Sequence, residues 1–131
     1  MLLSQIKKNK KFIKFSIVGA ITACIYILEI ILFYNYLNFN YMYVVCFSYL
    51  SCNLFHFYAN KIFTFGLTEK KISTNKVLSY IAIILLNTLL TMIFVFFLKE
   101  IIGLTVISSS IFTLLITVVV GFFLMRKFVF N

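Results

Sequence analysis

The sequence has no proline and no tryptophan, and it holds four glycines, three acidic residues and one histidine among 131 residues. Without proline, and with so little glycine, helices can run unbroken. So few acids and histidines leave no paired carboxylates, no catalytic triad and no metal cluster, and no phosphate-binding loop is present. The composition argues against an enzyme and predicts neither a metal nor a cofactor.

The sequence also lacks a CxxC motif and a recognisable signal-peptide cleavage site. Cys24, Cys46 and Cys52 lie inside apolar runs without a CxxC motif, so we expect small buried hydrophobic side chains rather than ligands or disulfides. The first apolar run is long and lacks a small-residue cleavage site. It is better interpreted as a signal-anchor helix than as a signal peptide.

Apolar residues dominate what is present. The chain is 63% hydrophobic and 11% charged, whereas a soluble domain has about 25% charged residues. These values predict a membrane protein. The formal net charge of +9 is then interpreted as an orientation signal and a surface for anionic head groups, and we expect no nucleic-acid partner.

Four apolar runs predict an all-α membrane protein with four transmembrane helices in two hairpins. The runs cover about residues 15–36, 41–60, 77–98 and 104–125 within a single domain, 1–131. A helix of about 22 residues spans roughly 33 Å, enough to cross the hydrocarbon core with some tilt. The basic stretch 1–14 has two interpretations, an interfacial segment lying on anionic lipid or a plain orientation signal.

The positive charges are distributed unequally between the two ends of the predicted bundle. Eleven of the twelve lysine and arginine residues fall in the N-terminal stretch, the 61–76 loop and the C-terminal stretch, and Lys99 alone falls on the other side. The positive-inside rule therefore predicts that both termini are cytoplasmic.

Polar residues repeat at helical spacing on each predicted helix. At 3.6 residues per turn, such residues share a face that should turn towards protein or a wet cavity. The faces are Gly19, Thr22, Tyr26 and Glu29 on the first helix, Tyr49, Asn53, His56 and Asn60 on the second, and Tyr80, Asn87 and Thr91 on the third. Thr113, Thr117 and Gly121 form a small-residue seam on the fourth, which predicts close approach of another helix.

Three motifs lie at the ends of the predicted helices. They are Phe15-x-x-Val18-Gly19, then Asn60-Lys61-x-x-Thr64-Phe65 after the second helix, and Arg126-Lys127-Phe128-Val129-Phe130 at the end of the fourth. Together they resemble the GtrA-like family of small bacterial membrane proteins. The resemblance covers nearly the whole chain. It implies a role in cell-surface polysaccharide or teichoic-acid glycosylation, in the bacterial cytoplasmic membrane. The implied activity is translocation of a polyprenyl-phosphate-linked sugar, often glucose, made by a separate membrane glycosyltransferase.

Residues suited to such a lipid can be named, each beside a structural alternative. Cations near the cytoplasmic interface could hold the phosphate or could only anchor the helices, and the intramembrane amides and His56 could bind sugar or join helices. Glu29 could be a proton-linked or sugar-binding acid, or a shallow hydrated residue. The candidate substrate-binding residues are Glu29, Asn53, His56, Asn60, Lys61, Asn87, Arg126 and Lys127.

Two other functions fit four short helices. A non-transporting subunit could anchor a glycosyltransferase in the membrane. A small multidrug exporter could exchange protons for cations at Glu29, although the charge bias and the basic rim speak against it. Because four short helices enclose little space, a homo-oligomer is a further expectation.

Overall fold

The structure is a computed structural model that describes residues 2–64 and 73–128. Four α-helices make up this part of the chain, and no strand occurs in it, which confirms the all-α prediction. Three of the helices continue into a π-helical turn. The elements are α1 (Leu2–Ile30) with η1 (Ile31–Tyr36), α2 (Tyr41–Ala59) with η2 (Asn60–Thr64), α3 (Thr74–Phe96) with η3 (Phe97–Ile101), and α4 (Val106–Phe128).

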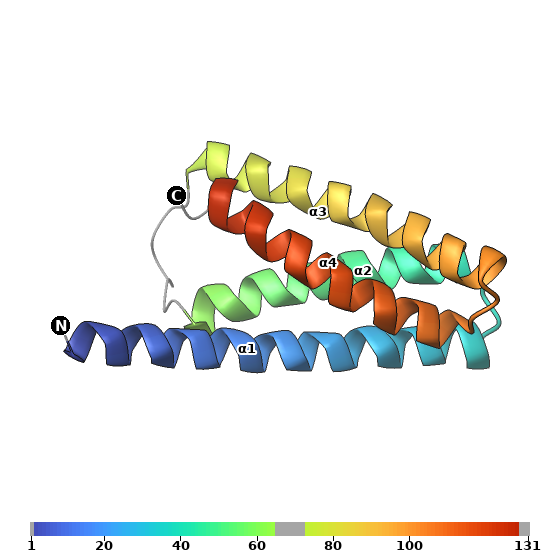
Figure 1. Ribbon diagram of the computed structural model, residues 1–131, viewed down its shortest axis with the longest axis horizontal. Coiled ribbons are helices and arrows are strands. Elements are labelled where there is room, and N and C mark those ends of the chain that lie inside the picture. Colours follow the sequence, from blue (N-terminus) through green and yellow to red (C-terminus); the bar gives the residue numbers. More distant parts are fainter. Residues whose placement is uncertain (1, 65–72, 129–131) are drawn as a thin grey trace.

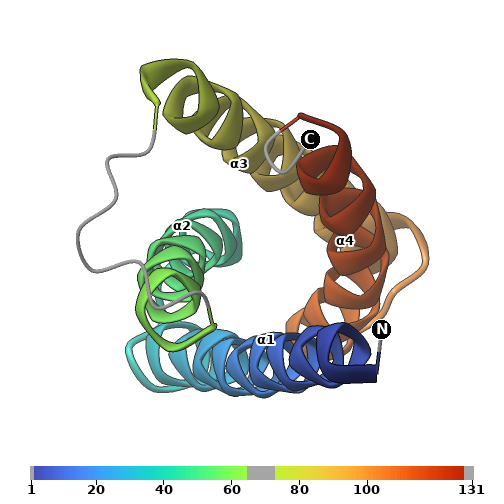
Figure 2. The same cartoon turned by 90° about the vertical axis from the view of Figure 1, so that its left-hand side faces the viewer.

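The helices form two antiparallel hairpins, α1–α2 and α3–α4, as predicted (Figure 1). Residues 37–40 and 102–105 connect them at one end of the bundle, here called the turn end. The start of α1, the end of α4, η2 and the start of α3 lie at the other, the terminal end. Seen along the bundle, the helices follow one another around a ring, and α1 and α4 share the smallest contact of the neighbouring pairs (Figure 2).

The first helix begins far earlier than predicted, at Leu2 instead of about residue 15. The stretch before Gly19 contains no glycine or proline, and lysine, glutamine and leucine are good helix formers. The basic segment is therefore continuous with the first apolar run instead of being a separate element. Helix α3 likewise begins at Thr74 and continues through η3 to Ile101, beyond both predicted bounds.

Both hairpin turns contain one residue with a positive φ. The first has Asn38 with a positive φ of 56°, and the second has Gly103 with a φ of 85°. In each, the following residue closes back on the helix, with Phe39 N donating to Phe33 O and Leu104 N donating to Leu98 O, both at 3.0 Å. These are Schellman-type closures, in which a left-handed residue ends the helix.

The interior of the bundle combines an apolar core with buried hydroxyl and amide side chains, and its outer surface is apolar. Large hydrophobic side chains are exposed on every helix, whereas several hydroxyl side chains are fully buried. Ile13–Tyr36 and Thr74–Ile101 are long and apolar enough to cross a membrane, and Val106–Gly121 is a shorter apolar helix. An apolar outer surface with polar groups kept inside is the arrangement expected in lipid.

The cysteines only partly follow the prediction. Cys52 is buried in the core beside Tyr49, and Cys46 is half-buried, but Cys24 is exposed, so its predicted burial is wrong. Cys24 is two residues from the buried Tyr26, which places it on the opposite side of α1. An apolar run in a membrane protein has a lipid-facing side, and hydropathy alone does not separate it from the core.

Candidate functional site

The polar faces of α1 and α2 meet, and Glu29 lies in their interface. Ser51 Oγ donates a hydrogen bond to Glu29 Oε1 at 3.0 Å, while the buried Oε2 has no partner within the described residues. The carboxyl group is thus half-buried with one oxygen still able to accept a hydrogen bond. Its role in substrate binding remains a prediction.

His56 lies on the same interface. It is five residues after Ser51 on α2, and so it is nearer the terminal end than Glu29 is. Its Nδ1 is 3.3 Å from Thr22 Oγ1, and the ring of Phe15 meets it edge-on with centroids 5.3 Å apart. The imidazole packs next to Gly19, since a Cβ at that position would lie 4.0 Å from His56 Cε1, an ordinary van der Waals distance. No three His, Cys, Asp or Glu side chains of the described residues are grouped to hold a metal ion.

Asn53 and Asn60 turn their amides onto their own helix. Asn53 Nδ2 donates to Tyr49 O at 2.7 Å, and Asn60 Nδ2 donates to His56 O at 3.0 Å. Tyr80 on α3 donates to Asn53 O at 3.2 Å, so the second and third helices are joined here. The link between the helices is made by the Tyr80 hydroxyl and the backbone carbonyl of Asn53, and sugar binding by the two amides remains a prediction.

Asn87 on α3 lies in close contact with Gly121 of α4. A Cβ at Gly121 would be only 2.9 Å from Asn87 Nδ2, and Thr113 and Thr117 beside it are almost fully buried. The predicted small-residue seam is therefore confirmed. Asn87 Oδ1 is buried without a partner, and within the described part of the chain it does not pair with Asn53.

Cations gather at the terminal end, although they come from different elements. Lys61 lies in η2 and is half-buried, while Lys127 lies in the last turn of α4 and is exposed. Arg126 lies beside it in α4, and its side chain falls outside the described part, as do Phe65 and residues 129–130. Lys14, which was not among the candidate residues, donates to Phe63 O at 3.3 Å and lies 4.9 Å from its ring centroid.

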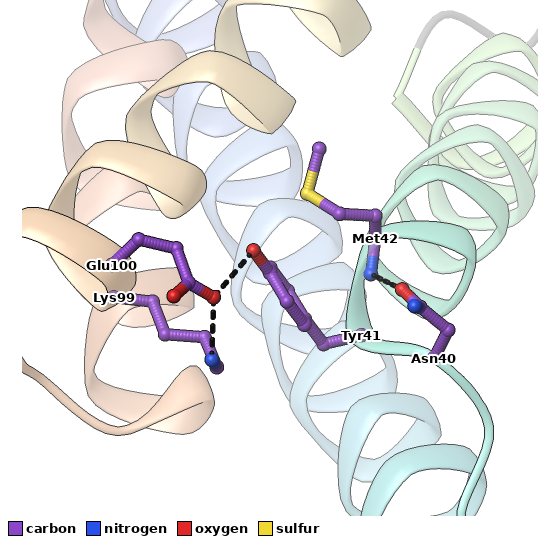
Figure 3. Close-up of polar contacts among 5 residues, drawn as sticks. All are labelled: Asn40, Tyr41, Met42, Lys99 and Glu100. Carbon is purple, nitrogen blue, oxygen red and sulfur yellow. Dashed lines mark hydrogen bonds and ion pairs between the residues drawn. The ribbon is translucent and has the colours of Figure 1, made fainter.

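A separate polar cluster closes the turn end (Figure 3). Glu100 Oε1 accepts from the Tyr41 hydroxyl at 2.9 Å and pairs with Lys99 Nζ at 2.7 Å, and this ammonium also lies 4.4 Å from the Tyr41 ring centroid. The cluster joins the start of α2 to η3 and so links the two hairpins. A half-open cavity of about 360 Å³ lies beside it, lined by Tyr34, Asn35, Lys99 and residues 104–107.

The candidate list omits a row of buried hydroxyl groups in the interior. Ser109, Ser110 and Thr113 on α4, with Ser48 on α2, are completely buried and lack hydrogen-bond partners within the described residues. A signal for part of this row was present, because Ser109, Thr113 and Thr117 are spaced four residues apart. Ser48 carries no such signal, since one serine in an apolar helix is uninformative by itself.

Comparison with known families gives a match over residues 14–130 to the family described as GtrA/DPMS, transmembrane domain. The match includes every predicted substrate-binding residue and all four helices except the first turns of α1. Searches of curated proteins and of solved structures gave no match.

Proposed function

The chain belongs to the GtrA/DPMS transmembrane domain family, and from this premise we propose that it moves a polyprenyl-phosphate-linked sugar across the bacterial cytoplasmic membrane. The match over residues 14–130 is the observation that carries the proposal. Glucose is the sugar to test first, and the product would serve glycosylation of a cell-surface polysaccharide or teichoic acid. We infer no catalytic step, because a separate membrane glycosyltransferase would make the lipid.

The charge distribution supports a cytoplasmic position for the terminal end. Eleven of the twelve basic residues belong to the sequence stretches at that end, and basic residues are retained on the cytoplasmic side of membranes. A lipid phosphate entering from the inner leaflet would meet Lys61, Arg126 and Lys127 first. Arginine can hold a phosphate with two hydrogen bonds, and lysine does so as a compact charge.

The buried polar side chains support passage of the sugar through the bundle. A sugar needs hydrogen-bonding groups where lipid offers none, and the interior provides them through Glu29 and the buried hydroxyl side chains. The prenyl chain needs the opposite environment, which the exposed leucine, isoleucine and phenylalanine side chains match. The head group would therefore move inside while the tail stays in lipid.

The test is a transfer assay in vesicles that carry polyprenyl-phosphate-glucose on one leaflet. Wild type would be compared with a variant carrying Lys61→Gln and Lys127→Gln, and with Lys99→Gln at the turn end as the control. Each interfacial cation is worth about 1 kcal/mol of attraction to an anionic lipid, or about fivefold in affinity. We therefore expect roughly 25-fold weaker lipid binding and slower transfer in the double variant, with little change in the control.

Failure of wild type to transfer lipid faster than empty vesicles, with the protein folded, would reject translocation. Capture of a membrane glycosyltransferase by the same preparation would then favour the anchoring subunit. Equal losses in the double variant and in Lys99→Gln would reject the cationic terminal end as the phosphate site while leaving translocation itself standing.

A further inference from the structure

Seven buried polar side-chain atoms make no hydrogen bond within the described residues. One is Oε2 of the half-buried Glu29, and the other six belong to residues that are at most 4% exposed. Native proteins leave few buried polar groups unpaired, because such a group loses its hydrogen bonds to water without replacement. The six, here called the unpaired polar set, belong to Tyr26, Ser48, Asn87, Ser109, Ser110 and Thr113.

All four helices contribute to the set. Half of it lies on one face of α4, where Ser109 and Thr113 are four residues apart and Ser110 lies beside them. The Tyr26 hydroxyl on α1 lies close enough to Ser110 for the two groups to interact, although their geometry is not that of a hydrogen bond, and Asn87 on α3 lies against Gly121 of α4. From Ser109 to Gly121 the row follows α4 for about 18 Å, more than half of the hydrocarbon thickness.

The chemistry of the set suits a neutral, hydroxyl-rich ligand. Hydroxyl groups both donate and accept, and the Asn87 carbonyl oxygen accepts. None of the six residues carries a charge, whereas the cations suited to a phosphate lie in η2 and at the end of α4. Resting on the proposed function, we propose that the unpaired polar set binds the hydroxyl groups of the sugar head during its passage.

The helix arrangement also indicates how the sugar enters. Among neighbouring helices, α1 and α4 share the smallest contact, and Tyr26 and Ser110 lie close to each other across that seam. Parting α1 from α4 would expose the set to the side, so the sugar could enter from the bilayer while its prenyl chain remains in lipid. Water could supply the missing hydrogen bonds when the sugar is absent.

The experiment measures the affinity of purified protein in lipid nanodiscs for two probes, polyprenyl-phosphate-glucose and polyprenyl phosphate without sugar. The test variants are Thr113→Val and Ser110→Ala combined with Thr113→Val. Thr88→Val is the matched control, because Thr88 is equally buried but its hydroxyl already donates to Ile84 O at 2.8 Å.

We expect Thr113→Val to bind the glucosyl lipid about fivefold more weakly and the double variant about 25-fold more weakly, as for one and two lost hydrogen bonds. Affinity for the lipid without sugar should be unchanged, and Thr88→Val should match wild type with both probes. The thermal unfolding midpoint of Thr113→Val should not fall, because no hydrogen bond within the protein is lost.

Three results would overturn the site: equal losses for both probes, unchanged affinity in the double variant, or a loss in Thr88→Val as large as in Thr113→Val. If wild type does not bind the glucosyl lipid more tightly than the lipid without sugar, the unpaired polar set binds water alone, and the sugar site is also overturned. A wild type with the expected binding pattern but no transfer in vesicles would instead reject the proposed function and support the sugar site.

Discussion

Glu29 shows how much can be inferred about one residue from the sequence and what the structure adds. Its position as an acid within an apolar run marked it as unusual, and its spacing from Tyr26 and Thr22 placed it on a shared face. The structure adds that Ser51 satisfies one carboxylate oxygen and leaves the other buried and unpaired. A carboxyl group with a free oxygen at the interface of α1 and α2 is suited to accept a hydrogen bond from a sugar.

Substitution of Glu29 by glutamine tests this role. The amide oxygen can still accept from Ser51, and no charge has to be buried, so the thermal unfolding midpoint should stay or rise. Transfer of the glucosyl lipid should fall about tenfold or more, because a hydrogen bond to a charged group is lost. Transfer in vesicles and thermal unfolding followed by circular dichroism measure the two effects.

Glu100→Gln is the control for that substitution, because Glu100 lies in the polar cluster at the turn end, away from the interior. Surface pairs of this kind contribute little, so its transfer rate should stay within about twofold of wild type. Unchanged transfer in Glu29→Gln would mean that Glu29 is a hydrated residue near the outer surface.

At the scale of elements, the two hairpins are built alike. Each ends its first helix in a π-helical turn, passes through a left-handed residue, and caps the next helix two residues later with Asn40 or Thr105. The cap side chains accept from Met42 N at 3.0 Å and Ser108 N at 3.2 Å. Equivalent turns in both halves favour a parallel duplication of one hairpin.

The α3–α4 hairpin has one position where a larger side chain should not fit. A Cβ at Gly121 would already crowd Asn87 Nδ2 at 2.9 Å, so Gly121→Leu forces the helices apart. We expect a loss of about 1–3 kcal/mol in the free energy of unfolding, as for other overpacked interiors. Thermal unfolding of the purified protein by circular dichroism measures it.

Val119→Leu is the comparison for Gly121→Leu, since Val119 is 55% exposed on the same helix and faces lipid. It should leave the unfolding midpoint unchanged. Similar midpoints for the two variants would mean that α4 does not pack against α3 through its small-residue seam.

For the whole molecule, the distribution of charge between the two ends of the bundle predicts its orientation in the membrane. Basic residues belong to the stretches at the terminal end, whereas the turn end carries Lys99, which is paired with Glu100. If the terminal end is cytoplasmic, Ser73→Cys and Ile102→Cys should lie on opposite sides of the membrane. Both residues are exposed at their ends of the bundle.

The two positions can be probed in a background without Cys24, Cys46 and Cys52, using a membrane-impermeant thiol reagent. Ile102→Cys should be labelled in intact cells, and Ser73→Cys only after the membrane is permeabilised. Labelling of Ser73→Cys in intact cells would reverse the inferred orientation, and labelling of both would indicate that the chain inserts in two orientations.

The sequence by itself determined the class of protein, the four helices and their pairing, because these depend on composition and on local periodicity. Apolar runs of spanning length give helices in lipid, and short turns make consecutive helices antiparallel neighbours. The seam at Thr113, Thr117 and Gly121 was also visible, since regular spacing of small residues is a local pattern. The early start of α1 was missed because charged residues end a hydropathy run without ending a helix.

Only the tertiary structure decided which polar groups find partners. Spacing put Asn53, His56 and Asn60 on one face, yet the amides turn to their own backbone and His56 meets Thr22 of another helix. Conversely, Ser48 and Ser110 became notable only because packing buried them without partners. Hydrogen bonding depends on the positions of atoms from several helices at once, and no single segment of sequence specifies those positions.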